Sequence, residues 1–124
     1  MKNNLPNLAL AILRIGTAAM LLTHGIPKIE ILFAETVSFP DPLGIGAIFS
    51  LILVLIAEVL APVFIIIGYR TKIASLFPII MMIVGLLMVH FNDSFAEKEK
   101  AVFYLLAFIV IFLAGPGKYS IDKR

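Results

Sequence analysis

The 124-residue chain contains no cysteine, no tryptophan and few charged residues. Without cysteine, disulfides, thiolate nucleophiles and iron–sulfur clusters are excluded within the chain, so a redox role needs a bound cofactor, a partner or an electron-carrying substrate. Only 15% of the residues are charged and 61% are hydrophobic, whereas soluble domains are about half apolar and about a quarter charged. Together with a mean hydropathy of +1.08, this predicts an integral membrane protein of one domain over residues 1–124.

The sequence carries a net charge of +2, and its basic residues flank apolar runs instead of clustering. This pattern is typical of membrane proteins and argues against a nucleic-acid partner, so the lipid bilayer is the expected surrounding.

Four apolar runs are predicted to cross the membrane as helices, which takes about 20 residues each. They extend over about Leu5–Ile26, Leu43–Gly68, Ile73–Phe91 and Ala101–Ala114. Gly68 is a natural helix stop, and Asn92, Asp93 and Ser94 offer stop or cap residues before the fourth run. The fold class predicted is therefore an all-α, four-helix transmembrane bundle.

Loop lysines and arginines predict the orientation of these spans. Six of them (Lys2, Arg70, Lys72, Lys118, Lys123 and Arg124) fall on the side of the termini, and three (Lys28, Lys98 and Lys100) fall on the other. Because cytoplasmic loops carry the excess of positive charge, both termini are predicted to be cytoplasmic in the cell membrane.

Two charged residues lie deep in the first two spans. Helical rise places Arg14 about 13 Å and Glu58 about 15 Å from the cytoplasmic side, so the two are expected to pair across neighbouring helices. Pro62 lacks an N–H and frees the carbonyl of Glu58 as a further acceptor. Two interpretations stay open: the pair only pins the helices together, or it lines a cavity that binds substrate.

Further polar residues are predicted at the outer level. His24 and Lys28 share one stripe of the first helix with Arg14, while His90 and Glu99 come at the outer ends of the third and fourth spans. These groups predict a polar funnel, with His24, His90 and Glu99 as candidate catalytic residues and Lys28, Arg14 and Glu58 as candidate substrate-binding residues. Histidines that merely satisfy backbone or water are the alternative.

No metal is expected at this outer level. His24, His90 and Glu99 are suitable ligand types, but their spacing gives no local ligand motif and Lys28 would repel a cation.

Several short motifs, in this order and spacing, resemble the DoxX family over nearly the whole chain. They are Arg14 followed by His24-Gly25 and Lys28, then Glu58, then Gly68 with Thr71, Lys72 and Ala74, then His90, Glu99 and the terminal GPGKYSID. Lys72 departs from the arginine common in the family. The resemblance implies a four-helix transmembrane bundle, and relatives include a subunit associated with thiosulfate:quinone oxidoreduction.

Three functional hypotheses follow. The first is a membrane subunit of an oxidoreductase that binds a quinone-like or small anionic sulfur substrate, with His24 or His90 transferring protons, Arg14 or Lys28 contacting an anion, and membrane or peripheral redox proteins as partners. The second is a non-enzymatic membrane module that assembles or stabilises partner proteins. The third, a small proton-coupled exporter, is disfavoured because the first span carries Arg14 instead of a glutamate.

Overall fold

The computed structural model describes residues 4–123, and every regular element in this part of the chain is helical, which confirms the predicted all-α fold. The helices follow in the order α1 (Leu5–Gly25), η1 (Ile26–Lys28), α2 (Ile29–Leu32), α3 (Ala47–Leu55), η2 (Ile56–Leu60), α4 (Ala61–Ile67), α5 (Thr71–Val84), η3 (Gly85–Val89) and α6 (Phe95–Ala114). Segment η1 is a 3-10 turn, whereas η2 and η3 are π-helical turns within longer helices.

Local sequence signals explain where these helices begin and end. Gly68 ends α4 in the left-handed conformation at φ 74°, which a residue without a Cβ adopts freely. Ser94 begins α6 with a reciprocal capping box, because its side chain accepts from the Glu97 amide and its own amide donates to the Glu97 carboxylate. The stop predicted at Gly68 and the cap predicted at Ser94 are thus confirmed.

Three continuous helical stretches of the described chain are long and apolar enough to cross a membrane: Leu5–Leu32, Ala47–Ile67 and Thr71–Val89. The first four residues after Ala96 in α6 are all charged, so its apolar part is residues 101–114. At 1.5 Å per residue this part is about 21 Å long, which is short of a bilayer core of about 30 Å. Three of the four predicted spans are therefore confirmed by length and composition.

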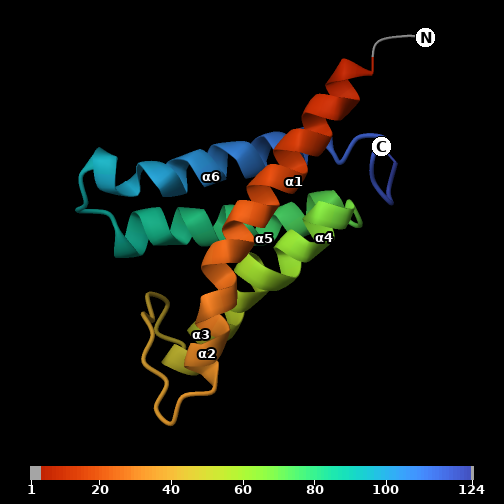
Figure 1. Ribbon diagram of the computed structural model, residues 1–124. Coiled ribbons are helices and arrows are strands. Elements are labelled where there is room, and N and C mark those ends of the chain that lie inside the picture. Colours follow the sequence, from red (N-terminus) through yellow and green to blue (C-terminus); the bar gives the residue numbers. More distant parts are fainter. Residues whose placement is uncertain (1–3, 124) are drawn as a thin grey trace.

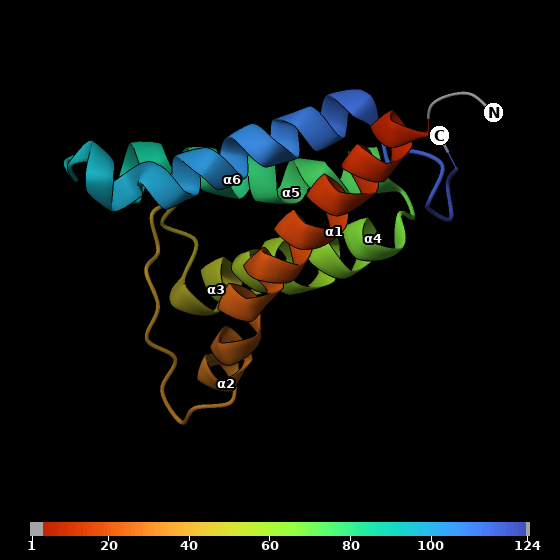
Figure 2. The same ribbon diagram turned by 45° about the horizontal axis from the view of Figure 1, so that its top comes forward.

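The helices lie close together near the chain ends and fan apart toward the other end (Figure 1). Helices α5 and α6 run side by side, while α1 lies along the helix formed by α3, η2 and α4 (Figure 2). The axes of the two pairs cross at an oblique angle, so the helices do not form a bundle with aligned axes. Loop 33–46 returns along the open side between the pairs.

A buried core of three alanines and five larger apolar residues holds the two pairs together. It contains Ala18, Leu21, Ala61, Ile65, Ala74, Met82, Phe108 and Ile111. The alanines let helix backbones approach closely. In a membrane this close van der Waals packing holds helices together, because lipid tails are as apolar as the side chains and no hydrophobic force drives helices to associate.

Candidate functional site

A π-helical turn in the second membrane-length helix positions Glu58. Because Pro62 has no N–H, the carbonyl of Glu58 cannot receive the usual bond from four residues onward. The helix widens at η2, where the amide of Ala61 donates to the carbonyl of Ile56. π-helical turns are frequent at functional sites. This one points the Glu58 carboxylate toward the inside of the molecule, where the side chain is only 7% exposed.

Gly25 at the end of α1 packs directly against this turn. A Cβ built on Gly25 would lie 2.5 Å from the backbone oxygen of Glu58, closer than real Cβ atoms come. Only glycine therefore permits this approach. Pro62 was predicted to free that carbonyl as an acceptor for Arg14 or a ligand, and Gly25 instead lies against it.

Lys28 completes the site one helical turn after Gly25. Its Nζ donates to Glu58 Oε1 at 2.7 Å, and its side chain is 31% exposed. Pairing accounts for a carboxylate within a membrane-length helix, since an isolated charge there is costly.

The ion pair lies at the edge of a cavity of about 480 Å³ between α3–η2 and α5–η3. Its polar lining residues are Lys28, Ser50, Glu58 and His90, and the remaining walls are mainly aliphatic and aromatic. Residues 39, 40, 42 and 43 of the long loop contribute to the lining. The cavity therefore combines apolar walls with a few polar groups, as small-molecule sites do.

Asp41 fixes the loop that borders the cavity. Its carboxylate accepts from Ser50 Oγ at 2.8 Å and from the amides of Gly46 and Ile45 at 2.7 and 3.0 Å. These hydrogen bonds, with that of Ser50 foremost, hold the pKa of Asp41 below its usual value. The carboxylate thus ties the loop to the first turns of α3.

Arg14 lies elsewhere, so the predicted Arg14–Glu58 pair is wrong. Its buried guanidinium donates to the carbonyls of Pro116, Tyr119 (2.7 Å) and Ile66 (3.3 Å). Arg14 therefore clamps the C-terminal segment 115–123 against the end of α4. The depths were misjudged because α1 is offset along α4: Arg14 is level with Ile66, and Gly25 is level with Glu58.

The same C-terminal segment docks on the α4–α5 turn through its backbone. The amides of Ile121 and Asp122 donate to the carbonyls of Ile67 and Gly68 at 3.1 and 2.9 Å, and Asp122 Oδ2 accepts from the amide of Thr71 at 3.2 Å. No signal in the sequence pointed to this docking, because Glu58 offered Arg14 a carboxylate partner at the same predicted depth.

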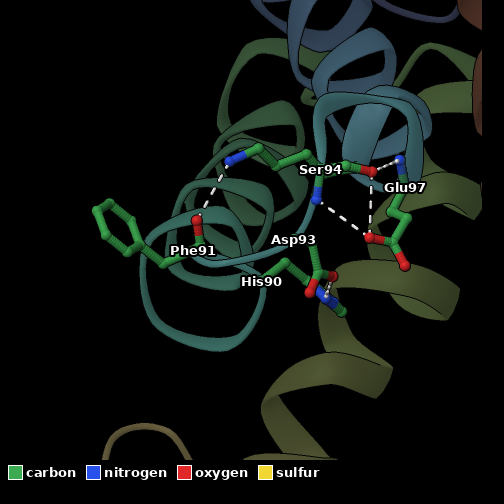
Figure 3. Close-up of polar contacts among 6 residues, drawn as sticks. His90, Phe91, Asp93, Ser94 and Glu97 are labelled. Carbon is green, nitrogen blue, oxygen red and sulfur yellow. Dashed lines mark hydrogen bonds and ion pairs between the residues drawn. The ribbon is translucent and has the colours of Figure 1, made fainter.

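Of the three candidate catalytic residues, only His90 lines the cavity. Its Nδ1 lies 2.8 Å from Asp93 Oδ2, beside the Ser94–Glu97 capping box, as Figure 3 shows. His24 is exposed, with its ring edge-on to Tyr104 at 6.0 Å, and Glu99 is exposed on α6. Neither His24 nor Glu99 belongs to the cavity lining, so the predicted funnel is reduced to Lys28, Glu58 and His90.

Comparison with known proteins identifies the family. Residues 9–91 match the family model DoxX, which covers most of α1 and everything through η3, and leaves α6 and the C-terminal segment outside the match. Searches of curated proteins and of solved structures gave no match. The matched region contains Arg14, Gly25, Lys28, Glu58 and His90, and it spans more than half of the chain, so this membrane protein belongs to the DoxX family.

Proposed function

We propose that this DoxX family protein binds a quinone-like molecule in the cavity beside Lys28 and Glu58, as a membrane subunit of an oxidoreductase. The observation that carries the proposal is the combination of apolar walls with one buried ion pair. A volume of about 480 Å³ falls within the usual range of about 300–1,000 Å³ for small-molecule sites. A quinone has the matching character, since an apolar ring bears two carbonyl acceptors.

The residues present fit such a ligand. Lys28 donates one hydrogen to Glu58, and an ammonium group has three, so two remain for a carbonyl oxygen. A bound quinone supplies two-electron, two-proton redox chemistry. His90 is half exposed at the cavity and is placed to pass protons between water and the ligand. The electrons come from a partner redox protein, because the chain has no cysteine and no group of its own to carry them.

The geometry favours this ligand over a small sulfur anion. The positive charge of Lys28 is already balanced by Glu58, and Arg14 is occupied by backbone carbonyls away from the cavity. A small anion in this apolar cavity would therefore find no unpaired positive charge to bind it. Of the two predicted substrate classes, the quinone-like molecule is therefore the better match.

We further infer that α6 also crosses the cell membrane, which gives four spans with both termini in the cytoplasm. Helix α6 packs along the whole of α5, and Lys98 and Lys100 next to its apolar part can extend their ammonium groups to the interface. The bias of loop lysines and arginines gives the orientation.

A non-enzymatic module that stabilises partner proteins is the second candidate. The placement of His24 and Glu99 away from the cavity favours it, because two of three candidate catalytic groups then have no common substrate. In that case the cavity is a packing defect filled by lipid, and no quinone binds selectively.

Quinone titration of the purified protein in lipid nanodiscs separates the two candidates. Gly85 lines the cavity, and a Cβ there meets nothing within 4 Å, so Gly85→Leu fills the space without a backbone clash. Gly16 on α1 has equally open surroundings and lies outside the cavity, which makes Gly16→Leu the matched control.

A short-chain benzoquinone and a short-chain naphthoquinone are the probes, with calorimetry as the readout. We expect saturable binding by the native chain and by Gly16→Leu, and loss of at least an order of magnitude in affinity for Gly85→Leu. No saturable binding, or equal binding by both variants, would refute the proposal.

A further inference from the structure

A second hollow shares one lining residue, Phe77, with the cavity. It measures about 320 Å³ and runs between η2–α4 and α5. One wall consists of Ile56, Leu60 and Phe64, and the other of Ile73 and Phe77. Leu60 and Ile73 are 53% and 56% exposed, so the hollow is a groove open at the side. Both walls belong to membrane-length helices, so its apolar part faces the lipid layer.

The groove ends at a cation that the turn holds in place. Tyr69 and Arg70 line this end, and the Arg70 guanidinium lies 5.6 Å from the centre of the Tyr69 ring. Arg70 adopts a left-handed backbone at φ 52°, a conformation that costs a non-glycine residue roughly 1–2 kcal/mol. The guanidinium also hydrogen-bonds the Tyr69 side chain and is attracted by Asp122, although within the described residues no carboxylate lies within ion-pair distance of it.

Three lysines belong to α5 and to the C-terminal segment that docks on the turn of Arg70. Lys72 follows on α5, and Lys118 and Lys123 lie exposed on the C-terminal segment that docks on the same turn. Asp122 is the only acidic residue of the turn and the segment, and its carboxylate accepts from the Thr71 amide. The apolar groove between two membrane-length helices thus ends at one cation, the guanidinium of Arg70.

We propose that this groove binds an acyl chain of an anionic phospholipid, whose phosphate group contacts Arg70. The apolar walls accept the chain, and a guanidinium binds phosphate through paired N–H donors. A zwitterionic lipid would bring its ammonium group close to the Arg70 guanidinium, where like charges repel. Charge complementarity therefore selects an anionic headgroup such as phosphatidylglycerol.

The absence of tryptophan allows a direct test. Leu60→Trp places a single fluorophore on the groove wall, and Leu106→Trp places one on the exposed face of α6, where neither hollow is lined. Each variant is reconstituted with phosphatidylglycerol or phosphatidylcholine that carries the same brominated acyl chains at the same mole fraction. Taking the ratio of quenching by the two lipids within one variant removes the effect of the fluorophore's depth, because that effect is the same for both lipids.

We expect the local phosphatidylglycerol preference at Leu60→Trp to be about fivefold, the effect of one basic residue on an anionic lipid, and the ratio at Leu106→Trp to be near one. Adding Arg70→Gln should abolish the preference. Adding Lys100→Gln, which removes the same charge on α6, should leave it intact. Far-UV circular dichroism confirms that each variant is folded.

Equal ratios at the two tryptophan positions would overturn the proposal, and so would a preference that survives Arg70→Gln. Neither measurement involves a quinone, so this site and the proposed function can fail independently.

Discussion

Replacing Gly25 by alanine tests the contact that builds the ion-pair site. The new Cβ would lie 2.5 Å from the backbone oxygen, 2.7 Å from Cβ and 2.8 Å from the backbone carbon of Glu58. A carbonyl cannot rotate away as a side chain does, so α1 must move outward from η2. Overpacking of this kind costs about 1–3 kcal/mol, and the shift also lengthens the 2.7 Å contact between Lys28 and Glu58.

Gly16→Ala is the matched control because it lies on the same helix with nothing within 4 Å of its Cβ. Each alanine gains roughly 0.5–1 kcal/mol over glycine within a helix, and this gain cancels when the two variants are compared. We therefore expect Gly25→Ala to be less stable than Gly16→Ala by about 2 kcal/mol.

The assay is reversible unfolding in mixed micelles with increasing dodecyl sulfate, followed by circular dichroism. Quinone titration of the same samples reports whether the site moves with the helix. Equal free energies of unfolding for the two variants would show that Gly25 and Glu58 do not pack as described, and the account of the site would fall with that contact.

Four further results are expected. Arg14→Leu should cost about 3 kcal/mol, because three backbone carbonyls lose a charged donor, and trypsin should then cleave the C-terminal segment faster than in the native chain. Lys28→Met should lower the free energy of unfolding by about 1–2 kcal/mol more than Glu58→Gln does. The methionine leaves the buried Glu58 carboxylate without its partner, whereas the glutamine amide still accepts a hydrogen bond from Lys28. The pKa of Asp41 is lowered by folding, so its stabilisation is complete above the unfolded pKa and is lost as the pH falls through the folded value; the stability difference between the native chain and Asp41→Asn should shrink over that acidic range. Reporter fusions at Met1 and Arg124 should both be cytoplasmic, and an outer location of either end would contradict the charge bias.

Local rules were sufficient for the end of α4, for the start of α6 and for the carbonyl that Pro62 frees, but the π-helical turn itself was not predicted. Gly68 and Ser94 act within a few residues of themselves, so their roles could be predicted from neighbouring sequence alone. The same holds for Pro62, since a missing N–H always frees the carbonyl four residues earlier. The residue that packs against this carbonyl is Gly25. Its position could not be deduced from the sequence, because it depends on how α1 and α4 are offset along each other.

The offset of α1 is also what made the Arg14–Glu58 prediction fail. The depth estimate assumed that both helices start at the same level, whereas α1 is displaced until Gly25 meets η2. Backbone carbonyls of the C-terminal segment then satisfy Arg14. Every residue carries such an acceptor, so a search of the sequence for opposite charges could not single these out.

Because Arg14 holds the C-terminal segment and Lys28 pairs with Glu58 at the cavity, a loss of function at Arg14 has to be interpreted differently from one at Lys28. Arg14 lies inside the family match, while two of its three acceptors, Pro116 and Tyr119, lie beyond it. An inactive Arg14 variant would therefore indicate an undocked C-terminal segment, not a lost substrate contact. The informative comparison is between quinone affinity and unfolding free energy in the same sample. Arg14→Leu should lose binding only in proportion to the folded fraction, whereas Lys28→Met should lose affinity in the protein that remains folded. If Arg14→Leu instead kept its full folded fraction and lost binding, a direct role for Arg14 at the ligand would have to replace the clamp.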